Sequence, residues 1–344
     1  MTDETPVWVA DPRIGWRILL TATLPVPSSP DDLAAPLRQL CEAQGWPYAA
    51  PVAAAARDLL GDSGPPLLVG VDGADVVLSA HHSAVDGLGL LALLDRLGLG
   101  PVTSSARGVG ERTSTGGLAR TVAQRLGEVA FRPPSGVTPP VRPVADHGDV
   151  LVSAEIPGSH RTADLVHAAA QAVVQHEEAR GRTARHVAIA IGAARDQQPE
   201  APVRDRSVLL RLRDVERLDR AGVAAALKAA PVQTPPVAAR RRPWTPVLDR
   251  LTTAGLRVLG PRLGSTMLVS HLGDVTAPAV ERLAFHPVTA GGTGLSLGAV
   301  GHDSHDGRTV LTLRARASSW NDDGLEQLLE AVISLLVETG RMRP

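Results

Sequence analysis

The chain has 344 residues, 35 of them basic and 36 acidic, so its formal net charge is -1. A nearly neutral chain with only 2% aromatic residues lacks the basic surface and the stacking side chains that nucleic-acid binding needs. Its single cysteine, Cys41, excludes an intrachain disulfide and a cysteine-rich metal site.

Targeting and membrane segments are not visible in the sequence. No apolar run reaches the roughly 18 residues that a membrane span requires. The opening Met1-Thr2-Asp3-Glu4 carries no basic region followed by a hydrophobic stretch, as a secretory signal would. We therefore expect a cytoplasmic protein with no membrane span.

The first third of the chain alternates strands and helices. Residues 16–24 are apolar and predict a strand, and a helix with Ser29 as its N-cap and Gly45 after its end follows. Two short strands are expected around the turn Asp72-Gly73, followed by a leucine-rich helix that ends at Gly98. This alternation predicts an α/β lobe.

A Pro-rich stretch at residues 133–143 has neither helical nor strand periodicity and predicts a linker. We place the boundary near residue 145, which gives an N-terminal lobe of residues 1–145 and a C-terminal lobe of residues 146–344.

The second lobe repeats the alternation of strands and helices. Thr162, Thr245 and Asn321 are expected to begin helices. Strands are expected over residues 150–156, 186–192, 207–213, 266–270, 294–300 and 309–317, the last two as a hairpin.

The sequence His81-His82-Ser-Ala-Val-Asp86-Gly87 lies between a predicted strand and a predicted helix. Two adjacent side chains point to different sides of an extended backbone, so only one histidine can readily face a cavity. An imidazole with an ordinary pKa of about 6.5 suits a general base at neutral pH. Gly87 allows the loop to bend where the helix begins.

Two other interpretations of this motif stay open. Asp86 could simply cap the leucine-rich helix, with both histidines as surface or hinge residues. Alternatively, His82 and Asp86 could share a helix face and bind a metal, although no further His/Asp cluster lies beside them in the sequence. We expect no metal.

The stretch from Ser79 to Gly89 resembles the HHxxxDG motif of the condensation-domain and acyltransferase superfamily, which includes condensation domains of nonribosomal peptide synthetases and chloramphenicol acetyltransferase. Two further segments are similar to family features. Residues 187–195 resemble its strand and arginine, and residues 269–273 resemble its Ser-Asn-x-Gly strand end, with His271 in place of asparagine.

The resemblance implies a role for each matching residue. His82 would be the general base or would position the nucleophile, and His81 would support it. Asp86 would be structural, in a salt bridge with Arg195. The backbone of Gly87 would approach the site and offer an N–H to the oxyanion. Ser270 and His271 would line the cavity from the second lobe and contact substrate.

The resemblance also implies a fold and an activity. The fold would be α/β (α+β) two-layer sandwiches, in which two chloramphenicol acetyltransferase-like lobes form a pseudo-dimer with a tunnel between them. The protein would be a free-standing acyltransferase of specialised metabolism, such as nonribosomal peptide biosynthesis. It would move an acyl or aminoacyl group from a thioester on coenzyme A or on the phosphopantetheine of an acyl or peptidyl carrier protein to a small amine or alcohol. No cofactor would be permanently bound.

Two alternatives keep the same fold. One is a binding or docking module that has lost transfer. The other is dehydration, cyclisation or epimerisation of a tethered intermediate.

The sequence contains three further features that are weaker signals. Residues 302–307 (His-Asp-Ser-His-Asp-Gly) read as a polar hairpin loop rather than a metal site. The run Arg240-Arg241-Arg242 is either a solvated loop or a contact for a phosphate. The tryptophans are scattered and read as core or rim residues: Trp8, Trp16, Trp46, Trp244 and Trp320.

Overall fold

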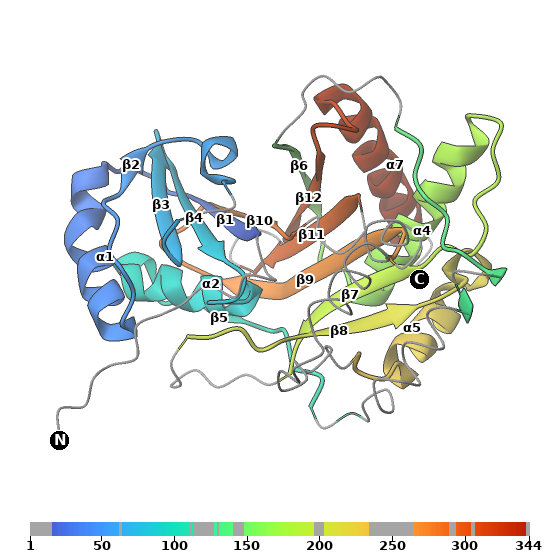
Figure 1. The fold of residues 1–344 in the computed structure, drawn as a ribbon, viewed down its shortest axis with the longest axis horizontal. Helices are drawn as coiled ribbons and strands as arrows, with labels where there is room; N and C mark the ends of the chain where they lie inside the picture. The colour runs from blue at the N-terminus through green and yellow to red at the C-terminus, as the bar shows by residue number, and fades with distance from the viewer. Residues whose placement is uncertain are drawn as a thin grey trace, which may run out of the picture.

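A computed structural model describes the protein as two β-sheets with helices, arranged side by side (Figure 1). The described residues are 16–61, 64–110, 112, 127–128, 131–139, 148–195, 203–233, 264–288, 294–303 and 307–341.

The first sheet has five strands in the order β10-β1-β4-β3-β2. Their bounds, with those of the helical segments of this lobe, are β1 (Arg17–Thr23), α1 (Pro30–Gln44), β2 (Val52–Ala53), η1 (Ala56–Leu59), β3 (Leu67–Asp72), β4 (Asp75–His81), α2 (Gly87–Leu94), η2 (Asp95–Leu99) and β10 (Arg282–His286). Helices α1 and α2 pack their leucines against one face of this sheet. The predicted strands and the first helix are confirmed, whereas the second α-helix ends at Leu94 and continues as the π-helical segment η2, in which Gly98 has a left-handed backbone (φ 86°).

Helix α1 shows how closely the local sequence sets the local structure. Ser29 accepts a hydrogen bond from the backbone N–H of Asp32, whose carboxylate accepts one from the N–H of Ser29, so the N-terminus carries a capping box. At the other end Gly45 adopts a left-handed conformation (φ 66°). Both ends of the helix are therefore where the sequence predicts them.

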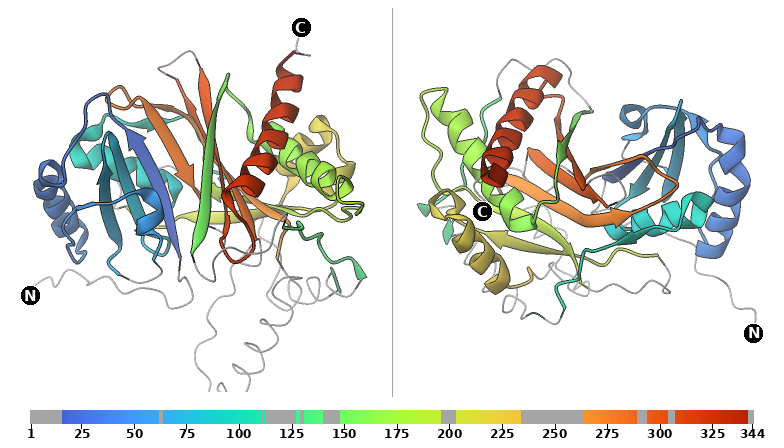
Figure 2. Two further views of the ribbon diagram at one scale, coloured as in Figure 1. Left: turned by 90° about the horizontal axis from the view of Figure 1, so that it is seen from above. Right: turned by 180° about the vertical axis from the view of Figure 1, so that it is seen from behind.

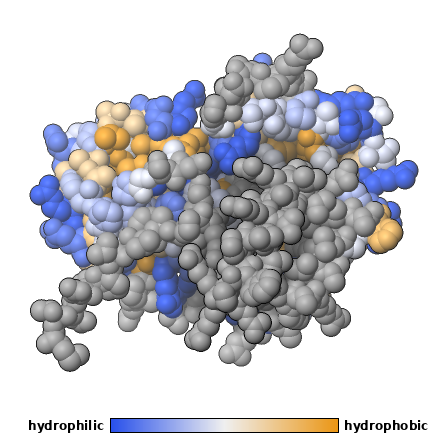
Figure 3. All heavy atoms as spheres, viewed as in Figure 1, coloured by the Kyte–Doolittle hydropathy of each residue, from blue (hydrophilic) through white to orange (hydrophobic). Residues whose placement is uncertain are grey.

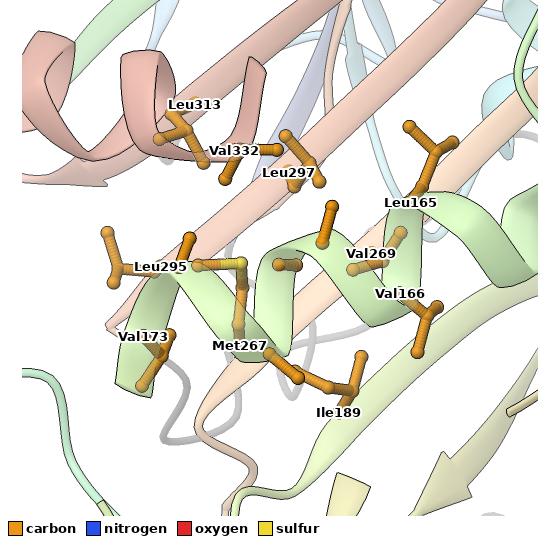
Figure 4. Packing of buried hydrophobic residues seen from close by; sticks show 14 of the residues in the cluster. Leu165, Val166, Val173, Ile189, Met267, Val269, Leu295, Leu297, Leu313 and Val332 are labelled. Atoms are coloured by element: carbon orange, nitrogen blue, oxygen red, sulfur yellow. The ribbon is translucent and has the colours of Figure 1, made fainter. Parts of the chain in front are cut away.

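The second sheet contains β6-β12-β11-β9-β7-β8, with β5 paired to β9. The bounds are β5 (Thr103–Ser104), β6 (Asp149–Pro157), α4 (Thr162–Glu178), β7 (Ile189–Ala194), β8 (Ser207–Leu212), η3 (Val215–Arg217), α5 (Arg220–Ala229), β9 (Met267–Thr276), β11 (Leu295–His302), β12 (Arg308–Arg316) and α7 (Asp322–Arg341). Apolar side chains from α4 and α7 meet those of the central strands in one core, which Figure 4 shows from close by.

The two sheets exchange strands across the predicted boundary. β10 comes from the C-terminal part of the chain but pairs with β1 of the first sheet, with Leu20 opposite Phe285. β5, from the N-terminal part, pairs with β9 of the second sheet. Residue 145 itself lies outside the described residues. The division at 145 therefore stays a prediction, and the sheets do not follow it strictly.

Three local predictions for the second lobe need correction. Thr162 does not cap α4 but is its first residue, and its hydroxyl bonds to His271 instead. The strand expected from His186 begins at Ile189, because His186 adopts a left-handed backbone (φ 60°). The strand expected to end at Ser270 continues to Thr276, with a bulge near Gly273 that keeps it in register with β11.

The described part of the predicted linker, residues 133–139, is bound to the second lobe. The N–H and hydroxyl of Thr138 donate to the carboxylate of Glu177 on α4, at 2.6 and 2.9 Å. His176 of the same helix contacts the carbonyl of Thr138 at 2.8 Å. This part of the segment therefore packs on the helix layer rather than spanning open solvent.

The sheets are joined by a buried polar contact as well as by β10. Arg314 of β12 forms an ion pair with Asp149 at 2.6 Å and donates to the backbone carbonyl of Arg17 in β1 at 2.7 Å. Both members of the ion pair are almost completely buried. Removing one member of a buried pair of this kind leaves the other charge uncompensated, which is strongly destabilising.

No described helix has the length and hydropathy of a membrane span. Hydrophilic and hydrophobic residues are interspersed over the described surface on the face drawn in Figure 3, and Figure 2 shows the two sheets from above and from behind. The predicted helix at Thr245 and the arginines 240–242 lie outside the described residues.

Candidate functional site

The two histidines of the motif point to opposite faces of the first sheet. β1 and β4 are antiparallel, with Ile18 opposite Ala80 and Arg17 opposite His81. The pairing extends one residue further, since the N–H of His82 donates to the carbonyl of Trp16 at 3.1 Å. His82 therefore lies on the face of Ile18 and Ala80, and His81 on the face of Arg17.

The ring of His82 is held in one orientation. Its Nδ1 lies 3.1 Å from the backbone carbonyl oxygen of Val85. A carbonyl oxygen only accepts hydrogen bonds, so in the neutral ring Nδ1 must carry the proton. Nε2 is then left with a lone pair, which is the protonation state of a general base.

His81 is enclosed by the protein. Its side chain is buried, and its Nδ1 lies 2.7 Å from the hydroxyl of Ser83. It does not belong to the lining of the large cavity described below, whereas His82 does. Of the two histidines, His82 therefore lines this cavity and His81 does not, in line with the alternation of side chains along the strand.

Asp86 is the N-cap of α2 and connects the two lobes. One carboxylate oxygen accepts from the N–H of Gly89 at 2.8 Å, and the other accepts from the N–H of Arg206, next to β8, at 3.0 Å. Burial raises the pKa of this carboxyl group, and the two amide hydrogen bonds act in the opposite direction.

The predicted partner of Asp86 is not found. Within the described part of the chain, no ion pair joins Asp86 to Arg195, whose side chain is exposed just after β7. Arg195 contributes its backbone instead, because its N–H donates to the carbonyl of Arg206. Backbone N–H groups thus satisfy the carboxylate that was expected to need a cation.

Gly87 is the first residue of α2 and lies against the second lobe. A Cβ atom at this position would come within 2.7 Å of Leu272 in β9 and 3.0 Å of Phe285 in β10. The absence of a side chain therefore allows close packing between the lobes. The N–H groups of Gly87 and Leu88 belong to the first turn of the helix, where the helix itself provides no acceptor.

A cavity of about 1150 Å³ lies between the lobes and includes His82, Asp86 and Gly87 in its lining. Strands β7, β8 and β9 line it from the second lobe, together with the segment after β5 and the N-terminus of α4. Both predicted residues of β9, Ser270 and His271, are part of the lining. The structure thus brings His82, Asp86, Gly87, Ser270 and His271 to one cavity.

Ser270 lies on the face of β9 that is directed at the first lobe. Its neighbours of the same parity, Leu268 and Leu272, belong to the hydrophobic core of that lobe. Gly192 is the partner of Ser270 on β7, and a Cβ there would lie 3.1 Å from its hydroxyl. The small neighbour leaves space around the hydroxyl group.

His271 lies on the other face of β9, at the N-terminus of α4. Its Nδ1 is 3.1 Å from the hydroxyl of Thr162, and its buried Nε2 has no hydrogen-bond partner among the described residues. Burial lowers the pKa of His271 to about 4, with the nearby Asp274 opposing this effect. The ring is therefore neutral at physiological pH.

Sequence reasoning missed several contributors to the cavity, among them Trp16 and the segment after β5. Trp16, interpreted as a core or rim residue, lines it beside His82. Residues 105–107 and 109 also line it. Ser105 holds this segment against β9, because its hydroxyl accepts from the N–H of Asp274 and its own N–H donates to the carbonyl of Asp274. The position of Trp16 could have been found by pairing residues 16–24 with the strand that precedes His82.

His186, Asp214 and Glu216 form a cluster of side chains of the kinds that bind metals, but these side chains already have hydrogen-bond or ion-pair partners within the protein. The carboxylate of Glu216 accepts from the N–H groups of His186 and Val187, and Asp214 pairs with His186 at 2.6 Å and with Arg132 at 3.0 Å. The cluster therefore fixes the start of β7. Of the loop 302–307, residues 304–306 lie outside the described part.

Comparison of the sequence with known proteins gave no matching family model and no matching curated protein. Solved structures do match. The epimerization domain of the third module of tyrocidine synthetase B is 13% identical, with a TM-score of 0.51 over 95% of this chain and 91% of that chain. A point mutant of the starter condensation domain of rhizomide synthetase, in complex with C8-CoA, is 15% identical, with a TM-score of 0.52 over 93% and 89%.

A third match is the EpoB cyclization-docking bidomain from Sorangium cellulosum, 13% identical, with a TM-score of 0.54 over 97% of this chain and 81% of that chain. The two-sheet architecture with a cavity between the sheets therefore has the expected α/β fold. More particularly, the chain has the fold shared by condensation, epimerization and cyclization domains.

Proposed function

We propose that the protein is an acyltransferase that moves an acyl or aminoacyl group from a thioester to an amine or hydroxyl acceptor. The observation that carries this proposal is the orientation of His82. Its Nδ1–H is held by the carbonyl of Val85, and the residue lines a cavity shared by both lobes. A base whose Nε2 carries a lone pair in such a cavity suits proton removal from a bound nucleophile.

The reaction needs no covalent enzyme intermediate. The acceptor nitrogen or oxygen attacks the thioester carbonyl carbon, and its proton passes to Nε2 of His82. The carbon–sulfur bond of the tetrahedral intermediate then breaks. The leaving thiolate takes the proton back from the imidazolium, which returns His82 to its neutral form.

The other residues of the site have supporting roles in this proposal. Asp86 holds the loop against the second lobe, and His81 anchors it from the opposite face of the sheet. The N–H of Gly87, at the positive end of α2, faces the developing oxyanion. Ser270 and His271 contact substrate from the second lobe.

Coenzyme A or a carrier protein's phosphopantetheine is the proposed donor, and a small amine or alcohol the acceptor. The cavity of about 1150 Å³ exceeds the roughly 300–1,000 Å³ typical of small-molecule sites, so it has room for an extended arm and an acceptor. The rhizomide synthetase domain, with the same fold, was solved in complex with C8-CoA. Both donors are substrates here, and no resident cofactor is required.

Two alternative functions are supported by the different kinds of domain that share this fold. The matched structures include epimerization and cyclization-docking domains, so the same cavity could dehydrate, cyclise or epimerise a tethered intermediate, or only bind it. Mass spectrometry separates these outcomes, because transfer adds the acyl mass to the acceptor and dehydration removes 18 Da, the mass of water.

The test compares the wild type with His82→Ala and His81→Ala in reactions of acyl-coenzyme A and acyl-pantetheine thioesters with a panel of amines and alcohols. We expect His82→Ala to lose roughly 10²–10⁴-fold in turnover at nearly unchanged stability. His81→Ala should lose stability more than turnover, since its ring is buried. Equal product from the wild type and His82→Ala would contradict the proposal.

A further inference from the structure

Strands β7 and β9 are parallel neighbours in the second sheet that separate at the cavity. Their backbone pairing runs from Ile189 opposite Met267 to Gly192 opposite Ser270, and it ends there although both strands continue. The separation lies at the carboxyl end of the pair. In open α/β sheets, ligands bind in the crevice outside the carboxyl ends of the strands.

The segment after β5 bridges the separated strands. The N–H of Ser105 donates to the carbonyl of Asp274 in β9 at 2.8 Å, and the N–H of Val109 donates to the carbonyl of Ala194 in β7 at 2.9 Å. Part of the cavity lies between the two strands here, because residues 192–194 and 270–274 line it from both sides. We call this space the β7–β9 gap.

The β7–β9 gap is lined from both faces of the sheet. Successive residues of a strand point to opposite faces. Gly192 and Ser270 line the cavity on the face of the first lobe, and Ala193 and His271 line it on the other face. The cavity therefore reaches from His82 in the first lobe to the far face of the second sheet.

On the far face, two sides of the cavity differ in polarity. One side is formed by residues 159–162 at the N-terminus of α4, whose side chains are all polar. The other side, from β7, β8 and α5, consists mainly of apolar side chains, among them Ala193, Val208, Leu210 and Leu227. The second side suits an apolar part of a ligand.

Gly192 lies at the entrance of the β7–β9 gap, between Ser270 of β9 and Leu209 of β8. Its backbone is not left-handed, so the conformation does not require a glycine. A Cβ atom there would lie 3.1 Å from the hydroxyl of Ser270 and would narrow the entrance. Leu209 is 38% exposed although it is large and hydrophobic. A glycine inside a strand often marks a site where a ligand approaches the backbone closely.

We propose that the β7–β9 gap binds the aliphatic chain of the donor's acyl group and that Gly192 determines which chains can enter. A pantetheine arm carries amides and a hydroxyl group, and the acceptor is an amine or alcohol, so the acyl chain is the apolar part of the reacting molecules. The inference rests on the proposed function and deepens it by naming the substrate class, acyl thioesters with a chain of several carbon atoms. The thioester carbon stays beside His82 while the chain extends into the second sheet.

The binding test uses alkyl thioethers of pantetheine, which resemble the donor but cannot react. In calorimetry with the butyl, hexyl and octyl compounds, the affinity of the wild type should rise about 2- to 4-fold per added methylene. The side chain of Gly192→Val occupies the entrance, so the octyl compound should bind this variant roughly 10- to 100-fold more weakly than the wild type, with little change for the butyl compound. Gly192→Ala should show an intermediate loss.

Gly61→Val is the matched control. Gly61 does not line the cavity, and a Cβ atom there would meet no other atom within 4 Å. This variant should keep the rise in affinity that the wild type shows. Valine is favoured in strands, so Gly192→Val should stay folded, which urea denaturation checks. If it does not fold, Gly192→Ala provides the comparison.

Transfer assays with acetyl- and octanoyl-pantetheine distinguish this inference from the proposed function. A preference for long chains that Gly192→Val abolishes in binding, without transfer to any acceptor, supports the role of the β7–β9 gap and contradicts acyl transfer. Transfer that depends on His82, with the same chain preference in the wild type and Gly192→Val, supports the function and overturns the role of the gap.

Two further results would overturn the inference. One is equal affinity of the wild type for the three thioethers, or no binding of any of them. The other is a defect of Gly192→Val that follows the size of the acceptor instead of the length of the acyl chain, since the gap would then hold the acceptor.

Discussion

The two walls of the cavity are built in different ways. The wall from the first sheet is formed by the loop that contains His82, Asp86 and Gly87, by the start of β1, and by Phe285 of β10 with the two residues Pro287 and Val288 after it. The wall from the second sheet is assembled from β7, β8, β9, the segment after β5 and the N-terminus of α4. In the first wall, the proposed reactive groups lie in a short stretch of sequence. The second wall is formed by segments that are far apart in the chain.

Asp86 joins these two walls, and its loss should have the largest effect on stability. Asp86→Ala leaves the N–H groups of Gly89 and Arg206 without their acceptor, which should lower the free energy of unfolding by about 2–3 kcal/mol. The control is Asp219→Ala, which removes an exposed cap that only serves α5 and should cost about 1 kcal/mol. Urea denaturation measures both. Equal losses would show that Asp86 is only a helix cap.

Gly87 tests how closely the walls must pack. Gly87→Ala places a methyl group against Leu272 and Phe285, so we expect a loss of about 1–3 kcal/mol in the free energy of unfolding. Gly61→Ala is the matched control, because a Cβ at Gly61 meets no atom within 4 Å. It should stay within about 0.5 kcal/mol of the wild type. A tolerated alanine at position 87 would mean that the lobes can move apart at this point.

Acidification should lower the free energy of unfolding by a smaller amount, through the buried His286 of β10. Burial lowers the pKa of His286 to about 3, with Arg314 and Arg282 adding to the effect. The unfolded chain binds the proton near pH 6.5 and the folded chain does not, so stability is complete above pH 6.5 and falls below it.

His286→Gln provides the comparison for this pH effect. Between pH 7 and pH 5.5, the free energy of unfolding of the variant should fall by about 1 kcal/mol less than that of the wild type, measured by urea denaturation at each pH. The same sign applies to His271, whose pKa is about 4. Parallel pH profiles for wild type and variant would contradict a neutral, buried His286.

The loop of the first wall could be predicted from the sequence because its signals are local, whereas the contribution of β10 could not. The cap at Ser29, the turn at Asp72-Gly73 and the motif at residues 81–87 each depend on neighbouring residues. The architecture expected from the family resemblance is also found, in that two sheets with helices enclose the cavity.

The second wall could be predicted only in part, because its contacts join distant segments. No local sequence signal shows that Asp86 accepts a hydrogen bond from the backbone N–H of Arg206 rather than pairing with the side chain of Arg195. The extension of β9 beyond Ser270 depends on pairing with β11 and β5. The role of Thr162 depends on His271, more than a hundred residues away.

The position of β10 also determines how the chain can be divided. Cutting near residue 145 would remove the strand that covers one side of β1, where the backbones of Leu19 to Thr23 pair with Arg282 to His286. The freed edge would offer unpaired N–H and C=O groups to other chains, which favours aggregation. An isolated N-terminal fragment is therefore a poor expression target, and the two lobes should be produced as one polypeptide.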